Sequence, residues 1–248
     1  MTVLSATSAE PVVGPEPWTV IAFDAVASTM EEARRLAVDG ASDRTAIRAV
    51  AQSGGRGRLG RPWKSPPGNV YTTVILRPEV PTARAAELSL VAAVAMSDTI
   101  AGFAGPVSLK WPNDVLLGGG KVAGVLLEAI TAGAALSAVL VGIGINVASR
   151  PTLPERPTAR VAGVDADAVF DALLKALGDR YDQWRLDGLA GIRSAWLGRG
   201  PALDSAMTVG QGQIRIEGCF AGLESDGRLR LRLADGSVRS IASGEVLA

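Results

Sequence analysis

Histidine is absent from this 248-residue sequence, and cysteine occurs once, at Cys219. A single cysteine cannot form an internal disulfide, and without histidine there is no cysteine or histidine cluster to hold a metal ion. The lack of histidine also excludes histidine-based catalytic triads and the usual proton shuttle at neutral pH. Any catalysis must therefore depend on Lys, Arg, Asp, Asn and backbone amides.

Excess charge and long apolar runs are missing too. The 25 Lys and Arg residues balance 25 Asp and Glu residues, whereas broad binding to nucleic acid needs a positive excess, so no DNA partner is expected. The N-terminus has no basic start followed by a sustained apolar stretch, and the apolar run 88–100 is too short to span a bilayer. These features predict a cytoplasmic protein that makes no membrane contact.

Aromatic residues make up only 4% of the chain, so Ala, Val and Leu must fill most of the core. The hydrophobic pattern predicts a mobile tail over 1–16, an α+β domain over 17–200, and a small β domain over 201–248. In the larger domain, the expected strands are 18–24, 46–52, 69–76, 107–111, 122–130 and 136–147, with a turn at 116–120. The expected helices are one that starts in a capping box at Ser28 and Glu31, an amphipathic one over 82–103, and one over 166–184. Beyond residue 202, short β segments at 214–217, 219–223, 229–233 and 237–241, separated by Asp-Gly turns, predict a small antiparallel barrel.

A Gly- and Arg-rich loop over 53–68 carries the most distinctive chemistry. Its GxGxxG spacing fits a dinucleotide-binding loop, but the prolines that follow forbid the helix that such a loop must open. Arg56, Arg58 and Arg61 instead repel one another on a flexible backbone, and a phosphate or acyl phosphate would order them. The alternative is a solvated basic loop.

A second cluster combines the KWPND segment, Lys110 to Asp114, with Lys121. The Gly-rich run before Lys121 does not match a P-loop, because Val122 follows the lysine where Ser or Thr is needed. A strand ending before Asn113 and Asp114, with a lysine at the start of the next strand, places an amide, a carboxylate and an ammonium at neighbouring strand ends. Simple turn chemistry is the alternative for Asn113 and Asp114.

The segment 141–147 alternates glycine with apolar residues, at Gly142 and Gly144, and ends at Asn146. Glycine weakens a strand and often marks the close approach of a ligand or of another strand. Both interpretations stay open on the sequence alone.

Together, the GRGRxGRxW loop, the KWPND box with the KxxGxLxE strand from Lys121 to Glu128, and the GIGINV strand resemble bacterial biotin–protein ligases, in the same order along the chain. The resemblance runs from about Trp18 to Ala248, and DGRLRLR and ASGEV are similar to the C-terminal β cap of that family. It implies an α+β catalytic domain with a mixed sheet, like that of class II synthetases, and a small SH3-like C-terminal barrel. It also implies a form without an N-terminal DNA-binding domain, since about 16 residues precede the first expected strand.

The resemblance implies ATP-dependent formation of biotinoyl-5'-AMP with Mg²⁺, and transfer of biotin to a lysine of a biotin carboxyl carrier protein. The expected catalytic residues are Lys121, Arg56 and Asp114. The expected biotin-binding residues are Ser28, Thr29, Met30, Gln52, Gly55, Arg56, Gly57, Arg58, Lys121, Gly124, Gly142 and Gly144. The expected adenylate-binding residues are Arg56, Arg58, Arg61, Trp63, Asn113, Asp114 and Asn146. Met30 stands where the family commonly has Asn.

This chemistry suits a chain without histidine. When a carboxylate attacks the α-phosphate of ATP, two anions come together, so preorganised cations in a dry site lower the barrier. Two alternative functions are those of a lipoate–protein ligase and of a non-catalytic biotin-binding regulator. The oligomeric state, monomer or homodimer, and the metal ligands are not specified by the sequence.

Overall fold

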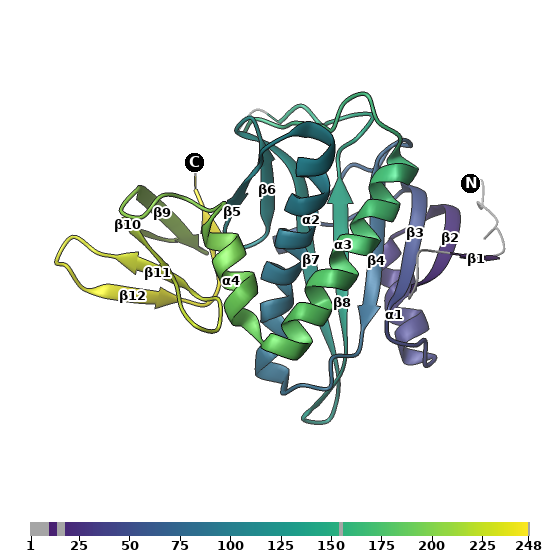
Figure 1. Cartoon of the computed structure of the whole chain (residues 1–248), viewed down its shortest axis with the longest axis horizontal. Coiled ribbons are helices and arrows are strands. Elements are labelled where there is room, and N and C mark those ends of the chain that lie inside the picture. Colours follow the sequence, from purple (N-terminus) through teal and green to yellow (C-terminus); the bar gives the residue numbers. More distant parts are fainter. Residues whose placement is uncertain (1–9, 14–17, 154–155, 248) are drawn as a thin grey trace.

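The computed structural model describes residues 10–13, 18–153 and 156–247, and shows a large mixed sheet with helices on both faces beside a smaller antiparallel sheet (Figure 1). The strands of the large sheet are β1 (Glu10–Val13), β2 (Thr19–Val26), β3 (Thr45–Gln52), β4 (Val70–Leu76), β5 (Ser108–Lys110), β6 (Asp114–Leu117), β7 (Gly120–Ala132) and β8 (Ala135–Ile145). They lie in the order β1-β2-β3-β4-β8-β7-β6-β5, and only β2 and β3 are parallel neighbours. The expected α+β class with a mixed sheet is confirmed.

The helices are α1 (Thr29–Val38), α2 (Leu88–Ala104), α3 (Ala166–Asp187) and α4 (Leu189–Leu197), with 3-10 turns η1 (Arg58–Gly60) and η2 (Thr82–Glu87). Side chains of a strand alternate between its two faces. In β8, Val139, Val141 and Ile143 therefore join the core with α2 and α3, while Ala138 and Leu140 join a second core under α1. Gly142 and Gly144 continue the α1 side of β8 beyond that second core.

Helix α2 differs from the amphipathic helix expected over 82–103. Eleven of its 17 residues are buried, on all sides of the helix, because α2 is packed between the sheet and the helices α3 and α4. The segment Thr82–Ala104 is long and apolar enough by composition to cross a membrane, but 67% of its most apolar window is buried inside the protein. Its apolar character is explained by the core.

Several shorter elements also differ from expectation. Part of the expected tail, Glu10–Val13, forms β1, whereas residues 1–9 and 14–17 lie outside the described part of the chain. The expected turn at 116–120 is tighter, because β6 runs to Leu117 and β7 starts at Gly120. Strands β6, β9 and β13 and helix α4 were not predicted.

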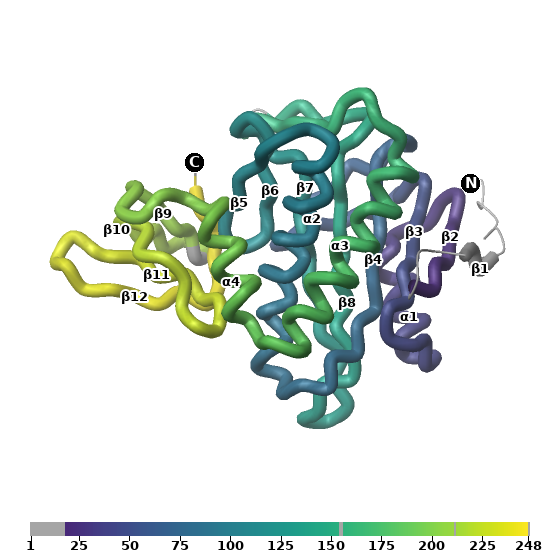
Figure 2. The backbone as a smooth tube through the Cα atoms, in the orientation of Figure 1, coloured from purple at the N-terminus to yellow at the C-terminus, as the bar shows by residue number. Residues whose placement is uncertain are grey.

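The smaller sheet follows α4 and lies at the opposite end of the molecule from β2 (Figure 2). Its strands are β9 (Ala206–Gln211), β10 (Ile214–Leu223), β11 (Leu229–Arg232), β12 (Val238–Ile241) and β13 (Glu245–Val246), in the order β12-β11-β10-β9-β13. Gly227 and Gly236 have φ values of 86° and 84°, as the predicted Asp-Gly turns require. The domain boundary predicted at residues 200 and 201 stays a prediction.

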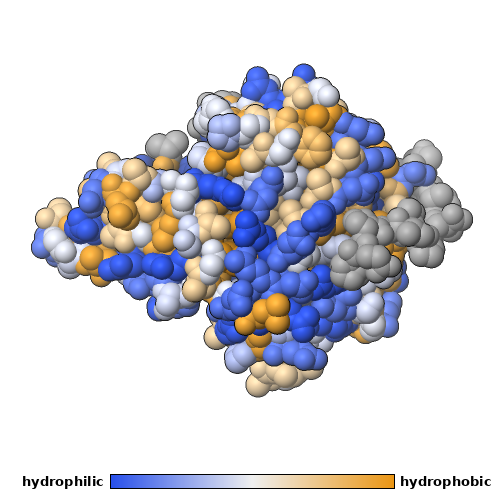
Figure 3. Space-filling model, in the orientation of Figure 1, coloured by the Kyte–Doolittle hydropathy of each residue, from blue (hydrophilic) through white to orange (hydrophobic). Residues whose placement is uncertain are grey.

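The two sheets share one continuous core rather than two separate ones. Trp196 of α4 packs against Phe220 of β10, with 6.3 Å between ring centroids, and the Arg193 guanidinium donates to the Leu223 carbonyl at 2.6 Å. On the face shown in Figure 3, hydrophilic residues cover much of the surface and apolar residues form scattered patches. The small domain is thus fixed against the large one, and β13 turns back from it toward the large sheet.

Candidate active site

A cavity opens on the α1 face of the large sheet, beyond the N-terminus of α1. It encloses about 830 Å³, including the space at its open mouth, and its walls come from α1, β4, β7, β8, the loop 53–68 and the turn after β5. The predicted site residues that line it are Ser28, Thr29, Met30, Gln52, Arg56, Gly57, Arg58, Arg61, Trp63, Asn113, Asp114, Lys121, Gly124, Gly142 and Gly144. Segments far apart in the sequence therefore meet at one cavity, and only Gly55 and Asn146 are not in its wall.

One end of the cavity is polar and carries no charge. The Gln52 side-chain oxygen accepts hydrogen bonds from Thr29 N at 2.9 Å and from Thr29 Oγ1 at 3.1 Å. Thr29 Oγ1 also lies 2.9 Å from Thr73 Oγ1 of β4, a residue that the sequence did not single out. Neutral donors and acceptors of this kind suit an uncharged polar ring system better than an ion.

Ser28 begins α1 as its N-cap, and its hydroxyl accepts from Met30 N at 3.2 Å. The helix start was thus predicted correctly. The reciprocal half of the expected capping box is not formed, since Glu31 instead lies 3.8 Å from Arg56 of the loop. Ser28 therefore acts on the helix, and its hydroxyl is already engaged.

Gly55 shapes the loop rather than the cavity wall. The Trp63 backbone N–H donates to the Gly55 carbonyl at 2.8 Å, and an added Cβ on Gly55 would lie 2.6 Å from Trp63 O and 2.7 Å from Ser65 Oγ. Ser65 Oγ in turn accepts from Gln52 Nε2 at 2.9 Å. Gly55 thus allows the loop to fold back on itself and orient Gln52.

The glycines of β7 and β8 form a strip on the sheet that side chains of the same protein cover. A Cβ on Gly142 would meet Met30 Cε at 2.7 Å, and one on Gly144 would meet the Trp63 indole at 2.6 Å. A Cβ on Gly124 would lie 3.1 Å from Lys121 Nζ. The close approach expected along 141–147 is therefore made, in this structure, by Met30 and Trp63.

Lys121 stands at the centre of the site. Its ammonium forms an ion pair with Asp114, and only 13% of each side chain is exposed. The same ammonium lies 5.4 Å from the centroid of the Trp63 ring. Burial lowers the pKa of Lys121, although the nearby Asp114 carboxylate opposes that shift. An incoming carboxylate could replace Asp114 as the partner of this lysine.

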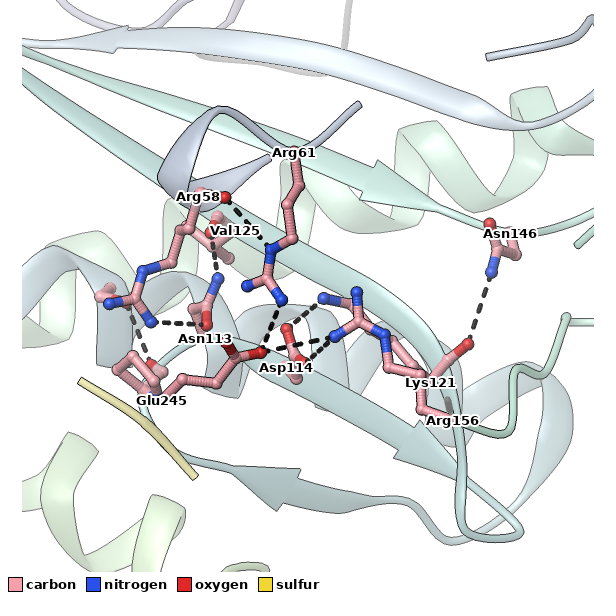
Figure 4. A network of polar contacts seen from close by, with 11 residues as sticks. Arg58, Arg61, Asn113, Asp114, Lys121, Val125, Asn146, Arg156 and Glu245 are labelled. Carbon is pink, nitrogen blue, oxygen red and sulfur yellow. Dashed lines mark hydrogen bonds and ion pairs between the residues drawn. The ribbon is translucent and has the colours of Figure 1, made fainter. Parts of the chain in front are cut away.

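Arg58 connects the loop to both domains (Figure 4). Its guanidinium donates to Asn113 Oδ1 at 3.3 Å and to the Gly244 carbonyl at 3.0 Å. The Asn113 amide donates in turn to the Val125 carbonyl at 2.6 Å. Burial lowers the pKa of Arg58, with the carboxylates of Glu245 and Asp114 opposing the shift. The turn at Asn113 thus positions an arginine as well as contributing its own side chain.

Glu245 of β13 adds a carboxylate from the small domain, as Figure 4 shows. It accepts from Arg61 at 2.9 Å and lies 3.7 Å from Arg156, which is itself 4.0 Å from Asp114. Burial raises the pKa of Glu245, but the hydrogen bond and charge of Arg61, together with Arg156 and Lys110, lower it more, so the net shift is downward. Sequence reasoning missed Glu245 and Arg156 as site residues, because neither lies in a motif that points to the loop.

The outer part of the loop is exposed. The Arg56 side chain is 69% exposed, and among the described residues its one ion pair is the distant contact with Glu31. Leu59 adopts a left-handed backbone with φ 58° and ψ 27°, and it is 81% exposed. Non-glycine residues rarely adopt this conformation, and here it places an apolar side chain in solvent at the tip of the loop.

A second cavity of about 1380 Å³ adjoins the first and shares Trp63, Lys110, Lys121, Arg156 and Glu245 with it. Its other walls are largely apolar, from Pro151, Leu153, Val246 and Leu247. Asn146 lies here rather than in the first cavity, and its side-chain amide donates to the Ala159 carbonyl at 3.0 Å. Trp63 and Lys121 therefore separate a pocket with a neutral polar end from one with an apolar wall, and cations line the junction.

Tyr71 is a further residue of the first cavity that was not predicted. Its hydroxyl donates to the Pro66 carbonyl at 2.8 Å, and burial raises its pKa to about 12.

No group of three or more Asp, Glu or Cys residues that could hold a metal ion occurs in the described part of the chain. Asp114 and Asn113 offer oxygens that fit a Mg²⁺ ion bound mainly by phosphates and water, the usual arrangement for this ion.

Comparison with known proteins identifies the family of this chain. The Biotin/lipoate A/B protein ligase family pattern matches residues 22–146, and the Biotin protein ligase C terminal domain pattern matches residues 206–247. The chain is 40% identical to the biotin–[acetyl-CoA-carboxylase] ligase of Paracoccus denitrificans, over 83% of this chain and 90% of the relative. The chain belongs to the biotin/lipoate A/B protein ligase family.

Relatives match nearly the whole chain, in structure as well as in sequence. A biotin protein ligase from Aquifex aeolicus in complex with biotin and ATP matches with a TM-score of 0.77 at 30% identity, covering 92% of this chain and 97% of that one. The bifunctional ligase/repressor BirA of Bacillus subtilis is 31% identical over 92% of this chain and 73% of its own length. The similarity therefore extends over both sheets.

Proposed function

We propose that this protein is a biotin–protein ligase that activates biotin with ATP, releases pyrophosphate, and transfers the biotinoyl group to a lysine of a biotin carboxyl carrier protein. The observation that carries this proposal is the junction of the two cavities, where a buried lysine lies between a neutral polar pocket and a cation-lined one. The names of the relatives agree with it. The cytoplasmic location predicted from the sequence is part of this proposal.

The ureido ring of biotin belongs at the neutral polar end, against Thr29, Gln52 and Thr73. A urea group offers two N–H donors and one carbonyl acceptor, which match hydroxyl and amide groups without introducing a charge. The biotin carboxylate then reaches Lys121, and it exchanges with Asp114 as the partner of the ammonium. Met30 gives this pocket an apolar side in place of the amide that the family commonly has.

The nucleotide belongs in the second cavity, with its base against the apolar wall and Asn146 and its phosphates at the junction. Arg58, Arg61 and Arg156 surround that junction, and their present partners are protein oxygens that phosphate can replace. Mg²⁺ would arrive with the nucleotide and neutralise part of the triphosphate charge, next to Asp114 and Asn113.

Reaction requires the carboxylate to approach the α-phosphate in line, against the repulsion of two anions. Lys121 and the loop arginines supply fixed positive charge at that point, and Trp63 covers the reacting groups and excludes water. The acyl-adenylate then persists until an amine of the carrier attacks its acyl carbon and AMP leaves. No step needs histidine.

The test is ATP-dependent labelling of a carrier domain from acetyl-CoA carboxylase by the full chain, with biotin and lipoate supplied in separate reactions. We expect biotin labelling and biotin-dependent pyrophosphate release. Transfer of lipoate instead would identify a lipoate–protein ligase, and biotin binding without pyrophosphate release would identify a non-catalytic binder.

A further inference from the structure

The lysines of this chain are few, and they lie mostly at the active site. Only four of the 25 basic residues are lysines, at positions 64, 110, 121 and 175. The first three line the second cavity. Lys175 lies on the outside of α3, 76% exposed, and pairs with Asp179 at 3.1 Å. Nearly every lysine amine of the protein is therefore close to the point where an amine-reactive acyl-adenylate would form.

The three lysines at the cavity differ in how they are engaged. Lys121 is buried and paired with Asp114, and Lys110 is half-buried beside Glu245. Lys64 directly follows Trp63, is exposed at the rim of the cavity, and makes no hydrogen bond or ion pair within the described residues. Lys64 is thus the lysine that is both next to the junction and free to approach a bound ligand from the solvent side.

We propose that Lys64 is a self-acylation site, modified by the protein's own acyl-adenylate when no carrier is present. This rests on the function proposed above. The unprotonated Lys64 amine attacks the acyl carbon, an amide C–N bond forms, the C–O bond to the phosphate breaks, and AMP leaves with the electron pair while the amine proton passes to solvent. Biotin and ATP supply every reactant, so no further co-reactant is needed.

The position of Lys64 favours this reaction over labelling at other lysines. An amine carried on the same loop as Trp63 has a high effective concentration at the junction, whereas Lys175 must meet acyl-adenylate that has escaped into solution. Arg58 and Arg61 of the loop donate to the Gly244 carbonyl and the Glu245 carboxylate, and phosphate oxygens can replace both acceptors. The loop can therefore move when nucleotide binds. Self-acylation would then compete with hydrolysis of the trapped adenylate, and a carrier lysine would compete with both.

The experiment incubates the full chain with biotin, ATP and Mg²⁺ without carrier, and locates biotin by intact mass and peptide mapping. We expect one biotinyl group, on Lys64, with a fraction labelled per unit time that does not depend on protein concentration. Lys64→Arg should reduce the label per acyl-adenylate formed by about tenfold or more, the advantage of a tethered amine, with biotin-dependent pyrophosphate release measured in parallel to count the adenylate formed. Lys175→Arg is the matched control and should leave self-labelling unchanged.

Label distributed over Lys175 and the N-terminal amine according to exposure would overturn the proposal, since it would mean that adenylate escapes before it reacts. A labelled fraction per unit time that rises with protein concentration would do so as well, because it would show transfer between molecules. Adenylate formation without any label on Lys64 would reject the self-acylation site and leave the ligase function intact. Absence of biotin-dependent pyrophosphate release would instead reject the ligase function itself.

Discussion

At the scale of single residues, the site is notable for how many of its proposed ligand-binding groups already have a partner in the protein. Lys121 has Asp114, Arg61 has Glu245, and Gln52 is engaged at both ends of its amide. A buried charge or amide left unpaired would destabilise the fold. Ligand binding in this site is therefore an exchange of partners.

Lys121 should dominate the first half-reaction. Lys121→Ala removes the ammonium that faces the biotin carboxylate and leaves Asp114 buried without its closest cation, so we expect the rate of biotin-dependent pyrophosphate release to fall by about two orders of magnitude or more. Lys121→Arg retains the charge and is the matched control, with a smaller loss. A near-normal rate in the alanine variant would rule out this role for Lys121.

The same lysine predicts a pH dependence. Burial lowers its pKa below the usual value of 10.5, so the ammonium of the free enzyme is lost at a lower pH than that of an exposed lysine. As pH rises through that pKa, kcat/KM for biotin in the first half-reaction should fall, because the neutral amine no longer attracts the carboxylate. Tyr71, with a pKa of about 12, does not titrate in this range. Lys121→Arg should abolish the fall, and a flat profile in the unmodified enzyme would contradict the assignment.

The two β8 glycines offer a matched pair of variants. Gly144→Ala would place a methyl group 2.6 Å from the rigid Trp63 indole, and Gly142→Ala would place one 2.7 Å from the flexible end of Met30. We therefore expect Gly144→Ala to displace Trp63 and raise the KM for biotin by about tenfold, and Gly142→Ala to have a clearly smaller effect. Steady-state pyrophosphate release measures both, and equal effects would mean that Trp63 does not stay over Gly144.

At the scale of elements, the structure shows which local patterns are sufficient for prediction. Most strands of the large sheet, α1 and α3 were predicted because each has its own periodicity or N-cap. Strand β6 was missed because it begins at Asp114, inside a segment that looks like a turn, and β13 because its two residues are strands only by pairing with β9. The burial of α2 on all sides depends on α3, which is about 70 positions away in the chain.

The residues of the candidate site likewise fall into those that local sequence patterns predict and those that only the tertiary fold places there. Residues in compact motifs, such as Lys121 and the loop arginines, were predicted because spacing and charge identify them locally. Thr73 looks like any β-branched strand residue, and Glu245 looks like part of a terminal cap. Their place in the site follows from the strand order and from the return of β13, neither of which the sequence pattern specifies.

The loop 53–68 should be the element that responds to ligands. Trypsin should cut the free protein after the exposed Arg56, and biotin with ATP should suppress that cut as the loop arginines engage the phosphates. Cleavage after Arg228, in the exposed turn between β10 and β11, provides an internal reference that ligands should leave unchanged. Equal cutting after Arg56 with and without ligands would show that the loop is not ordered by them.

At the scale of the whole molecule, the small domain contributes residues to the candidate site. It shares the core of the large domain, and it supplies both the Gly244 carbonyl, just before β13, that accepts from Arg58 and the Glu245 carboxylate of β13 that pairs with Arg61. Arginines from the loop are therefore positioned by residues about 185 positions further along the chain. The two sheets together position the charges that are proposed to bind phosphate.

Removal of the Glu245 charge tests this cooperation. Glu245→Gln should raise the KM for ATP several-fold, roughly three- to tenfold, while the KM for biotin changes little, because Arg61 and Arg156 lose the partner that orients them at the nucleotide side. Glu217→Gln makes the same charge change on an exposed position of β10 and should leave both constants unchanged. An equal rise in both constants would indicate a general loss of structure instead.

The strained backbone and exposed side chain of Leu59, at the tip of the loop, favour some movements of the loop over others. Its left-handed backbone carries an unfavourable conformational energy of about 1–2 kcal/mol, and its side chain is left in water. Any rearrangement that returned this residue to an ordinary backbone region and covered the leucine would recover both contributions. The unliganded loop therefore carries a small energetic bias toward any arrangement in which the Leu59 backbone is relaxed and its side chain is covered.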